Sequence, residues 1–71
     1  MEGGDFMEQF KISLKAARVN ANMKQSEVAE KLNKTAATIA AWENGDVNIK
    51  AVDLDNLCNL YNVPKDYIFL G

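Results

Sequence analysis

The side chains of this chain that could do chemistry are its charged groups, because the usual catalytic and metal-binding combinations are missing. The sequence contains no histidine and one cysteine, Cys58, so it offers no zinc-ligand spacing and no internal disulfide. It shows no plausible nucleophile–base pair and no glycine-rich phosphate loop. We therefore predict a binding protein that is not an enzyme and that needs no cofactor and no metal. We expect Cys58 to be an inert, buried thiol.

The charged groups are unevenly distributed. The net charge is −2, which argues mildly against a nucleic-acid partner, yet residues 6–45 carry six basic and four acidic groups, a net +2. The basic ones are Lys11, Lys15, Arg18, Lys24, Lys31 and Lys34. Residues 46–71 carry two lysines and four aspartates, a net −2, and Glu2 with Asp5 supplies the remaining −2. The positive part weakly favours phosphate contact, although an ordinary solvated surface accounts for it equally well.

Residues 25–45, QSEVAEKLNKTAATIAAWENG, indicate which elements position these groups. Two short amphipathic segments are joined by a polar break of about four residues, which is typical of a helix-turn-helix. Ala29 gives the first segment a small side chain where a second helix can cross closely. Ile39 and Trp42 give the second segment an apolar stripe that we expect to face the core. Thr35 is placed to cap this segment, and an Asn-Gly pair follows to end it.

The whole chain predicts an all-α fold of five helices without strands. The expected helices cover about residues 6–21, 25–32, 36–44 and 50–61, with a short fifth helix starting near Pro64. Residues 1–5 are expected to be a flexible tail, and residues 6–71 a single small domain. No apolar run approaches the length of a membrane span and no basic-then-apolar leader is present, so we expect a protein of the reducing cytoplasm.

The ends of the expected helices carry their own signals. Asp5 and Glu8 resemble a capping box for the first helix. Asn22, Asn33 and Asn62 each follow a predicted helix, where asparagine tolerates the left-handed backbone conformation that closes a helix.

The last apolar residues of the chain have two interpretations. Residues 67–70 are four consecutive apolar or aromatic side chains in a very small domain. They are equally consistent with closure of the core and with an exposed patch that forms a dimer interface or contacts a further domain.

Four segments of the chain together resemble the DNA-binding domain of phage-repressor-type regulators, the Xre family. They are LKAAR at 14–18, QSEVAEKL at 25–32, TIAAWENG at 38–45 and LCNLYNVPKDYI at 57–68. Each segment alone is weak evidence, but four in this order and spacing are specific. The resemblance implies a compact five-helix, lambda-repressor-like domain of bacterial or phage origin. It implies a repressor that binds palindromic double-stranded operators as a dimer, with the third helix, about 36–44, in the major groove.

The resemblance also implies which residues contact the DNA backbone. Gln25 matches the glutamine that opens the second helix, where a side-chain amide and free backbone N–H groups suit a phosphate. Lys24 precedes it and could add a charge, and Thr38 and Asn44 match further backbone positions. The alternatives are a solvated helix start for Lys24 and helix termination for Asn44.

The resemblance assigns a structural role to one pair of charges. Arg18 and Glu43 match an internal ion pair between the first helix and the end of the third. If such a pair is buried, removal of one partner strands the other charge and costs roughly 3–5 kcal/mol.

The base-reading positions are where the chain departs from the family. These positions are Lys34, Thr35, Ala36, Ala37 and Ala41. Family members often place Gln, Arg, Ser or Asn there, and each missing bidentate contact forgoes roughly 1–3 kcal/mol of discrimination. Alanine can pack only on a thymine methyl, so direct readout is expected from Thr35, Lys34 and Gln25. Two interpretations follow. The domain then reads a T-rich or deformable site, with specificity from DNA shape and half-site spacing, or this surface serves a protein partner, as in an antitoxin-like or anti-repressor adaptor.

Overall fold

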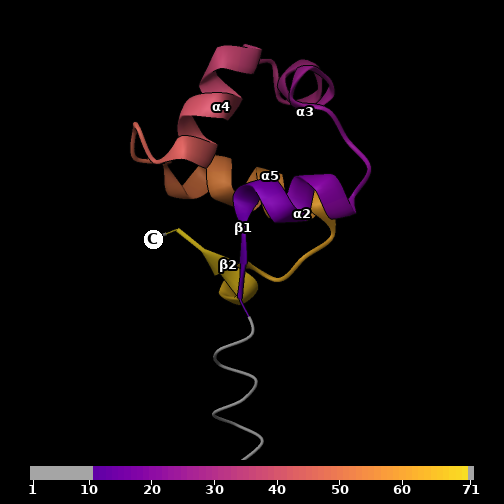
Figure 1. The fold of residues 1–71 in the computed structure, drawn as a ribbon, viewed down its shortest axis with the longest axis vertical. Coiled ribbons are helices and arrows are strands. Elements are labelled where there is room, and N and C mark those ends of the chain that lie inside the picture. Colours follow the sequence, from indigo (N-terminus) through magenta and orange to yellow (C-terminus); the bar gives the residue numbers. More distant parts are fainter. Residues whose placement is uncertain (1–10, 71) are drawn as a thin grey trace, which may run out of the picture.

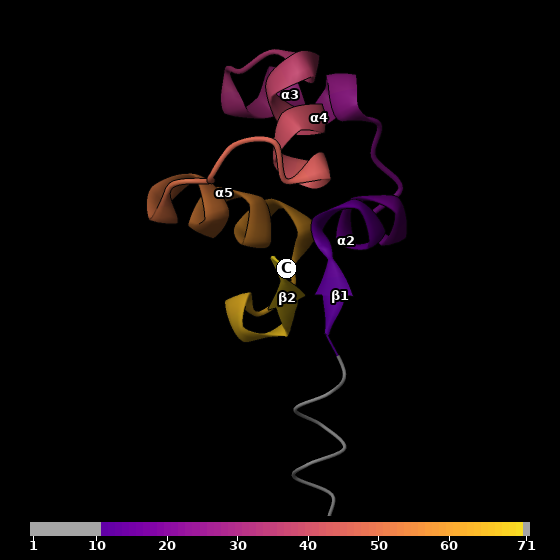
Figure 2. The same cartoon turned by 60° about the vertical axis from the view of Figure 1, so that its left-hand side comes forward.

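The computed structural model describes residues 11–70, and its helices are arranged in two tiers above a small pair of strands (Figure 1). The helices are α2 (Leu14–Asn20), α3 (Gln25–Leu32), α4 (Ala36–Asn44) and α5 (Ala51–Tyr61). Helices α3 and α4 form one end of the molecule, and α2 and α5 lie in the middle (Figure 2). The opposite end holds strands β1 (Ile12–Ser13) and β2 (Ile68–Phe69) and the short 3-10 helix η1 (Lys65–Tyr67).

The expected five-helix, all-α fold is wrong in two respects: residues 11–70 contain four α-helices, and they also contain strands. The helix expected from residue 6 begins at Leu14, because Ser13 is its N-cap. Ser13 has an extended backbone, and its Oγ accepts a hydrogen bond of 3.0 Å from the N–H of Ala16. The expected capping box, the flexible tail and the start of the expected first helix lie outside the described residues.

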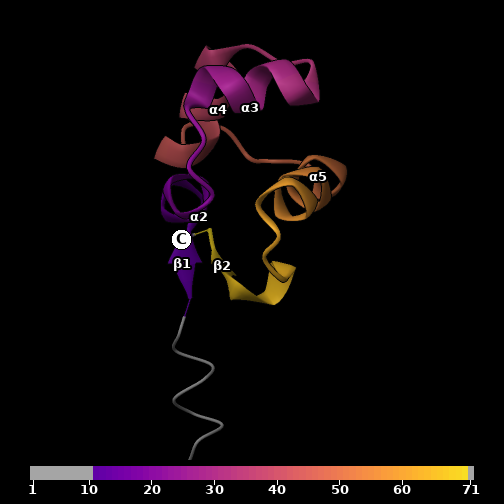
Figure 3. The same ribbon diagram turned by 90° about the vertical axis from the view of Figure 1, so that its right-hand side faces the viewer.

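Strands β1 and β2 pair in parallel, with Ile12 opposite Ile68 and Ser13 opposite Phe69 (Figure 3). The predicted fifth helix is reduced to the single turn η1, after which the chain becomes extended. Tyr67, Ile68 and Phe69 are aromatic or β-branched residues, which suit an extended strand better than a helix. The strands were not expected because two residues are too few to show an alternating pattern.

The ends of the helices follow the sequence closely. Asn22, Asn33 and Asn62 have φ values of 60°, 59° and 58°, so the predicted left-handed conformation is confirmed at all three. Thr35 caps α4 as predicted, since its Oγ1 accepts the N–H of Thr38 at 3.2 Å. Gly45 then ends α4 with a φ of 78°, which glycine adopts without steric cost.

The core lies between the four helices and is closed by the C-terminal strand. Ile39, Leu57 and Val28 are fully buried, and Trp42 and Cys58 are buried as expected. Of the four apolar residues at 67–70, Ile68 is buried, whereas its neighbours Tyr67, Phe69 and Leu70 are exposed. One side chain of this segment therefore closes the core and three are exposed, and an interface formed by the exposed side chains stays a prediction.

Adjacent residues of β2 allow a test of this arrangement. Ile68 is 7% exposed and Phe69 is 60% exposed. Ile68→Ala should lower the free energy of unfolding by about 2–5 kcal/mol, because it removes buried carbons and leaves a cavity. Phe69→Ala should change it by no more than about 0.5 kcal/mol. Urea unfolding followed by circular dichroism measures both, and equal losses would contradict the packing of β2.

Candidate nucleic-acid interface

Helices α3 and α4 are joined by a tight turn of three residues, 33–35. Asn33 takes the left-handed conformation, and the N–H of Lys34 then donates to the carbonyl of Ala29 at 2.8 Å, which closes α3. Thr35 immediately caps α4. Ala29 is buried, as expected for a small residue at a helix crossing, and the two helices pack against each other at one end of the molecule (Figure 2). This geometry is a helix-turn-helix.

The second helix of this motif has one buried and one accessible face. Ile39 and Trp42 point into the core. The positions predicted to read bases lie on the other side: Lys34, Thr35, Ala36 and Ala37 are exposed, and Ala41 is half-buried. The structure thus brings these five positions to one accessible surface, which we call the recognition surface.

The hydroxyl group of the recognition surface is engaged within the protein, whereas its lysine makes only a loose contact. The hydroxyls of Thr35 and Thr38 share a hydrogen bond of 3.0 Å, and Thr35 also caps the helix. The Nζ of Lys34 lies 3.8 Å from Oδ1 of Asp53 on α5, a loose ion pair. The sequence did not reveal either contact, because the first depends on the side-chain rotamers of two threonines and the second on the packing of α5 near the turn. What remains for a partner is mostly methyl groups.

The predicted backbone-contact residues lie at the start of α3, in the first turn of α4, where Thr38 is half-buried, and at the end of α4. Lys24 is the exposed N-cap of α3, and its backbone N–H donates to Oε1 of Glu27 at 2.7 Å. Gln25 is half-buried, and its Nε2 donates to Oε1 of Glu43 at 3.0 Å. Asn44 is the exposed last residue of α4. The N–H groups in the first turn of α3 lack helical partners and form a site suited to an anion.

Arg18 and Glu43 form a bidentate ion pair between α2 and α4. The Nε of Arg18 lies 2.6 Å from Oε2 of Glu43, and its Nη2 donates to Oε1 at 3.2 Å. The two side chains are only 11% and 4% exposed. The remaining Arg18 nitrogen, Nη1, donates to the carbonyl of Met23 at 3.0 Å. The hydrogen bond with Glu43 raises the pKa of Arg18, so the guanidinium stays charged.

Tyr61 on α5 lies in the electrostatic field of this pair. Burial raises the pKa of its hydroxyl to about 12, the negative charge of Glu43 adds to the rise, and Arg18 opposes it. The sequence predicted the pairing of Arg18 with Glu43 but not the participation of Gln25, Met23 and Tyr61.

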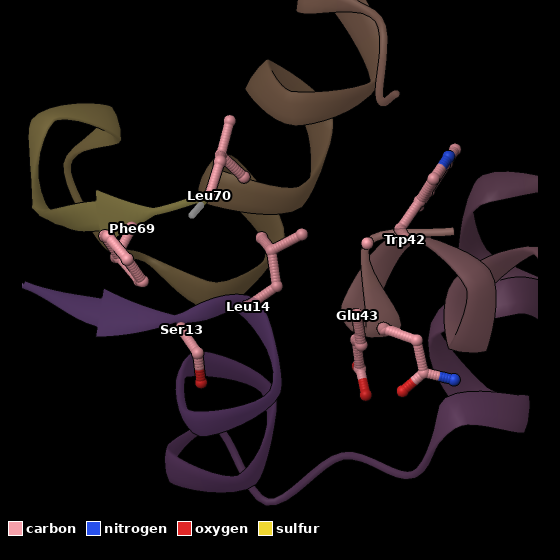
Figure 4. A pocket seen from close by; sticks show the side chains of 8 residues that line it. Ser13, Leu14, Trp42, Glu43, Phe69 and Leu70 are labelled. Carbon is pink, nitrogen blue, oxygen red and sulfur yellow. The ribbon is translucent and has the colours of Figure 1, made fainter. Parts of the chain in front are cut away.

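An open pocket of about 190 Å³ lies between the end of α4 and β2 (Figure 4). Leu14, Trp42, Phe69 and Leu70 give it an apolar lining. The carboxylate that contributes to its wall belongs to Glu43, which is already held by Arg18. The pocket therefore contains no free acid or base, and residues 11–70 hold no cluster of three His, Cys, Asp or Glu side chains that could bind a metal.

The fold and the recognition surface define the class of helix-turn-helix DNA-binding domains. A family model described as helix-turn-helix matches residues 14–68, from the first residue of α2 to the first residue of β2. The chain belongs to this helix-turn-helix family, whose members are DNA-binding transcription regulators. This match confirms the predicted resemblance. The comparisons with curated proteins and with solved structures found no match. Within residues 11–70, every helix falls short of the length and apolar character that a membrane span requires.

The energetic role of the Arg18–Glu43 pair can be measured by comparing single and paired substitutions. Arg18→Met leaves the Glu43 carboxylate buried without its partner and should cost about 3–5 kcal/mol of stability. The paired variant Arg18→Met/Glu43→Leu should recover most of this loss, because it leaves no buried charge.

The exposed pair of Lys65 with Asp55, 3.0 Å apart, provides the control. Lys65→Ala should leave stability nearly unchanged, since solvent screens exposed pairs. Thermal and urea unfolding measure all three variants. A paired variant as unstable as Arg18→Met would show that the pair contributes through packing and not through charge.

Proposed function

We propose that this chain is a sequence-specific transcription regulator, a repressor that binds a palindromic operator as a homodimer with α4 in the major groove. The observation that carries the proposal is the recognition surface: α4 packs Ile39 and Trp42 inward and leaves residues 34–37 accessible. The family match supports the DNA-binding class. Such a regulator would act in the cytoplasm, without a cofactor and without catalysis.

In this proposal the start of α3, the first turn of α4 and the end of α4 hold the DNA backbone. The free N–H groups and the positive end of the α3 dipole attract a phosphate, and Lys24 adds a charge. Thr38 and Asn44 serve neighbouring phosphates. The Glu27 carboxylate, which accepts the Lys24 N–H, opposes a phosphate there and keeps the contact moderate. Residues 24–45 carry three lysines and three glutamates, a net charge of zero, so attraction to DNA at this end would depend on where single lysines lie and not on an excess of positive charge.

Base recognition would rest on methyl groups. Ala36, Ala37 and Ala41 cannot form hydrogen bonds, and the hydroxyl of Thr35 is engaged with Thr38. Their methyl groups suit the C5-methyl of thymine, the apolar feature of the major groove. Further selectivity would come from the deformability of the site and from the half-site spacing of about 34–36 Å that a dimer imposes. Occupancy of such a site would block polymerase.

Selection from a random duplex library tests the proposal directly. The purified chain, incubated at low salt, should enrich a T-rich inverted repeat, and its affinity should fall steeply with added salt. Lys24→Ala should weaken all sequences alike and reduce the salt slope by about 1. Lys65→Ala, which removes a lysine at the opposite end of the molecule (Figure 1), should leave that slope unchanged. No enrichment above background would reject operator binding and favour the protein-interaction module.

Replacement of thymine by uracil isolates the methyl contacts. In the selected half-site, this change removes only the C5-methyl group and leaves base pairing intact. Affinity should fall about fourfold for each contacted thymine, given about 0.8 kcal/mol for a buried carbon of this size. Uracil placed outside the half-sites provides the control. Equal affinities for both duplexes in a fluorescence-anisotropy titration would show that methyl groups are not read.

A further inference from the structure

Glu43 accepts more hydrogen bonds than the Arg18 pair alone requires. Its carboxylate receives Nε of Arg18 at 2.6 Å, Nη2 of Arg18 at 3.2 Å and Nε2 of Gln25 at 3.0 Å. Oε1 is shared between Arg18 and Gln25. One buried oxygen therefore connects α2, the first residue of α3 and the last turn of α4.

The position of Glu43 in its own helix is locally unfavourable. It is the penultimate residue of α4, where the helix dipole is negative and an acidic side chain is disfavoured. The carboxylate is nonetheless almost completely buried. The position of Glu43 is thus explained by its hydrogen bonds with Arg18 and Gln25.

The bond to Glu43 fixes the orientation of the Gln25 amide. A carboxylate only accepts hydrogen bonds, so the amide nitrogen and not its oxygen must face Glu43. That nitrogen carries two hydrogens, and Glu43 takes one of them. The second remains available on a half-buried side chain at the start of α3. A freely rotating amide would also present its oxygen, which repels a phosphate.

Arg18 holds the segment before α3 in the same way. Its Nη1 donates to the carbonyl of Met23, two residues before Gln25. The start of α3 is therefore held from α2 through Met23 and from α4 through Gln25. Because the conformational freedom of this segment is lost on folding, it does not have to be lost again on binding.

We infer that Glu43 is a positioning residue for DNA-backbone binding, since it aims the Gln25 amide nitrogen at a phosphate while Arg18 neutralises its charge. The inference rests on the proposed function and deepens it. It makes the buried ion pair a determinant of DNA affinity in addition to stability. It also explains how the Glu43 carboxylate can lie beneath a surface proposed to bind phosphate, since Arg18 neutralises its charge.

A double-mutant cycle on DNA affinity tests the inference. In the wild-type chain, Gln25→Ala should weaken binding to the selected duplex about tenfold, the usual effect of losing a hydrogen bond to a charged group. In the Arg18→Met/Glu43→Leu background the same change should cost less than about twofold, since the amide is no longer oriented. Lys24→Ala is the matched control, and its cost should be the same in both backgrounds.

A conservative variant separates positioning from a purely structural role. In Arg18→Met/Glu43→Gln, the new side-chain carbonyl can still accept the Gln25 amide. The cost of Gln25→Ala should therefore return to nearly its wild-type value. Circular dichroism of each variant establishes that the chain is folded before its affinity is compared.

A measurement on the wild-type chain keeps the test independent of these variants. In its nuclear magnetic resonance spectrum, one Gln25 side-chain amide proton should be protected in the free protein and the other should shift when DNA binds. Equal costs of Gln25→Ala in both backgrounds, or an unchanged pair of amide signals, would overturn the inference while DNA binding stands. Failure of the wild-type chain to bind any duplex would overturn the proposed function and the inference together.

Discussion

The buried pair of Arg18 and Glu43 is the interaction on which the geometry of this small domain depends. Removing two charges from water is costly, and only close geometry with additional hydrogen bonds offsets that cost. Here the guanidinium has partners for Nε, Nη1 and Nη2, and no fully buried side-chain nitrogen or oxygen among the described residues lacks a partner. The pair thereby fixes α2, the start of α3 and the end of α4 relative to one another, so the two ends of the helix-turn-helix are not free to move independently.

The recognition surface offers few hydrogen-bonding groups, because three of its five positions are alanines and the Thr35 hydroxyl is bonded to Thr38. A bidentate side chain discriminates a base by roughly 1–3 kcal/mol, whereas one methyl contact contributes about 0.8 kcal/mol. Specificity on such a surface must be shared among several thymines and the shape of the DNA. Under the proposed function, affinity would then come mostly from contacts with the DNA backbone, to which Lys24 and the start of α3 would contribute. The Arg18–Glu43 pair, which holds the start of α3, would therefore matter more for DNA affinity when few side chains read the bases.

The sequence predicted the parts of the fold that local chemistry decides. The bounds of α3 and α4 follow from apolar spacing, from the Thr35 cap and from Gly45, and the three left-handed asparagines follow from their place after a helix. Residues 12 and 68 could not be paired in advance, because strands of two residues carry no periodic signal and their partner is distant in the chain. The start of α2 was missed because the cap signal at Ser13 competes with apolar spacing that continues before it.

In the candidate site too, the sequence predicted what depends on residues close in the chain and missed what depends on tertiary packing. Which residues lie on the accessible face of α4 follows from helical spacing, and the Arg18–Glu43 pairing followed from the resemblance. The bond between Gln25 and Glu43 did not, because it depends on how closely two helix ends approach after packing. The hydroxyl pair of Thr35 and Thr38 was likewise hidden, since a threonine at a cap can turn either to the helix or to a ligand.

The alanines of α4 lack hydrogen-bonding side chains, but they lower the entropy cost of binding. Alanine is the strongest helix former and loses no rotamer freedom, so Ala36, Ala37 and Ala41 stabilise the helix and lose no side-chain entropy when a partner covers them. A glutamine or arginine at these positions would gain a hydrogen bond but would have to be ordered on binding. Under the proposed function, the recognition surface and the start of α3, which is held through Gln25 and Met23, would need little ordering when DNA binds. A rigid surface with few hydrogen-bonding groups discriminates by fit, which favours sequences whose grooves already match it over sequences that must deform.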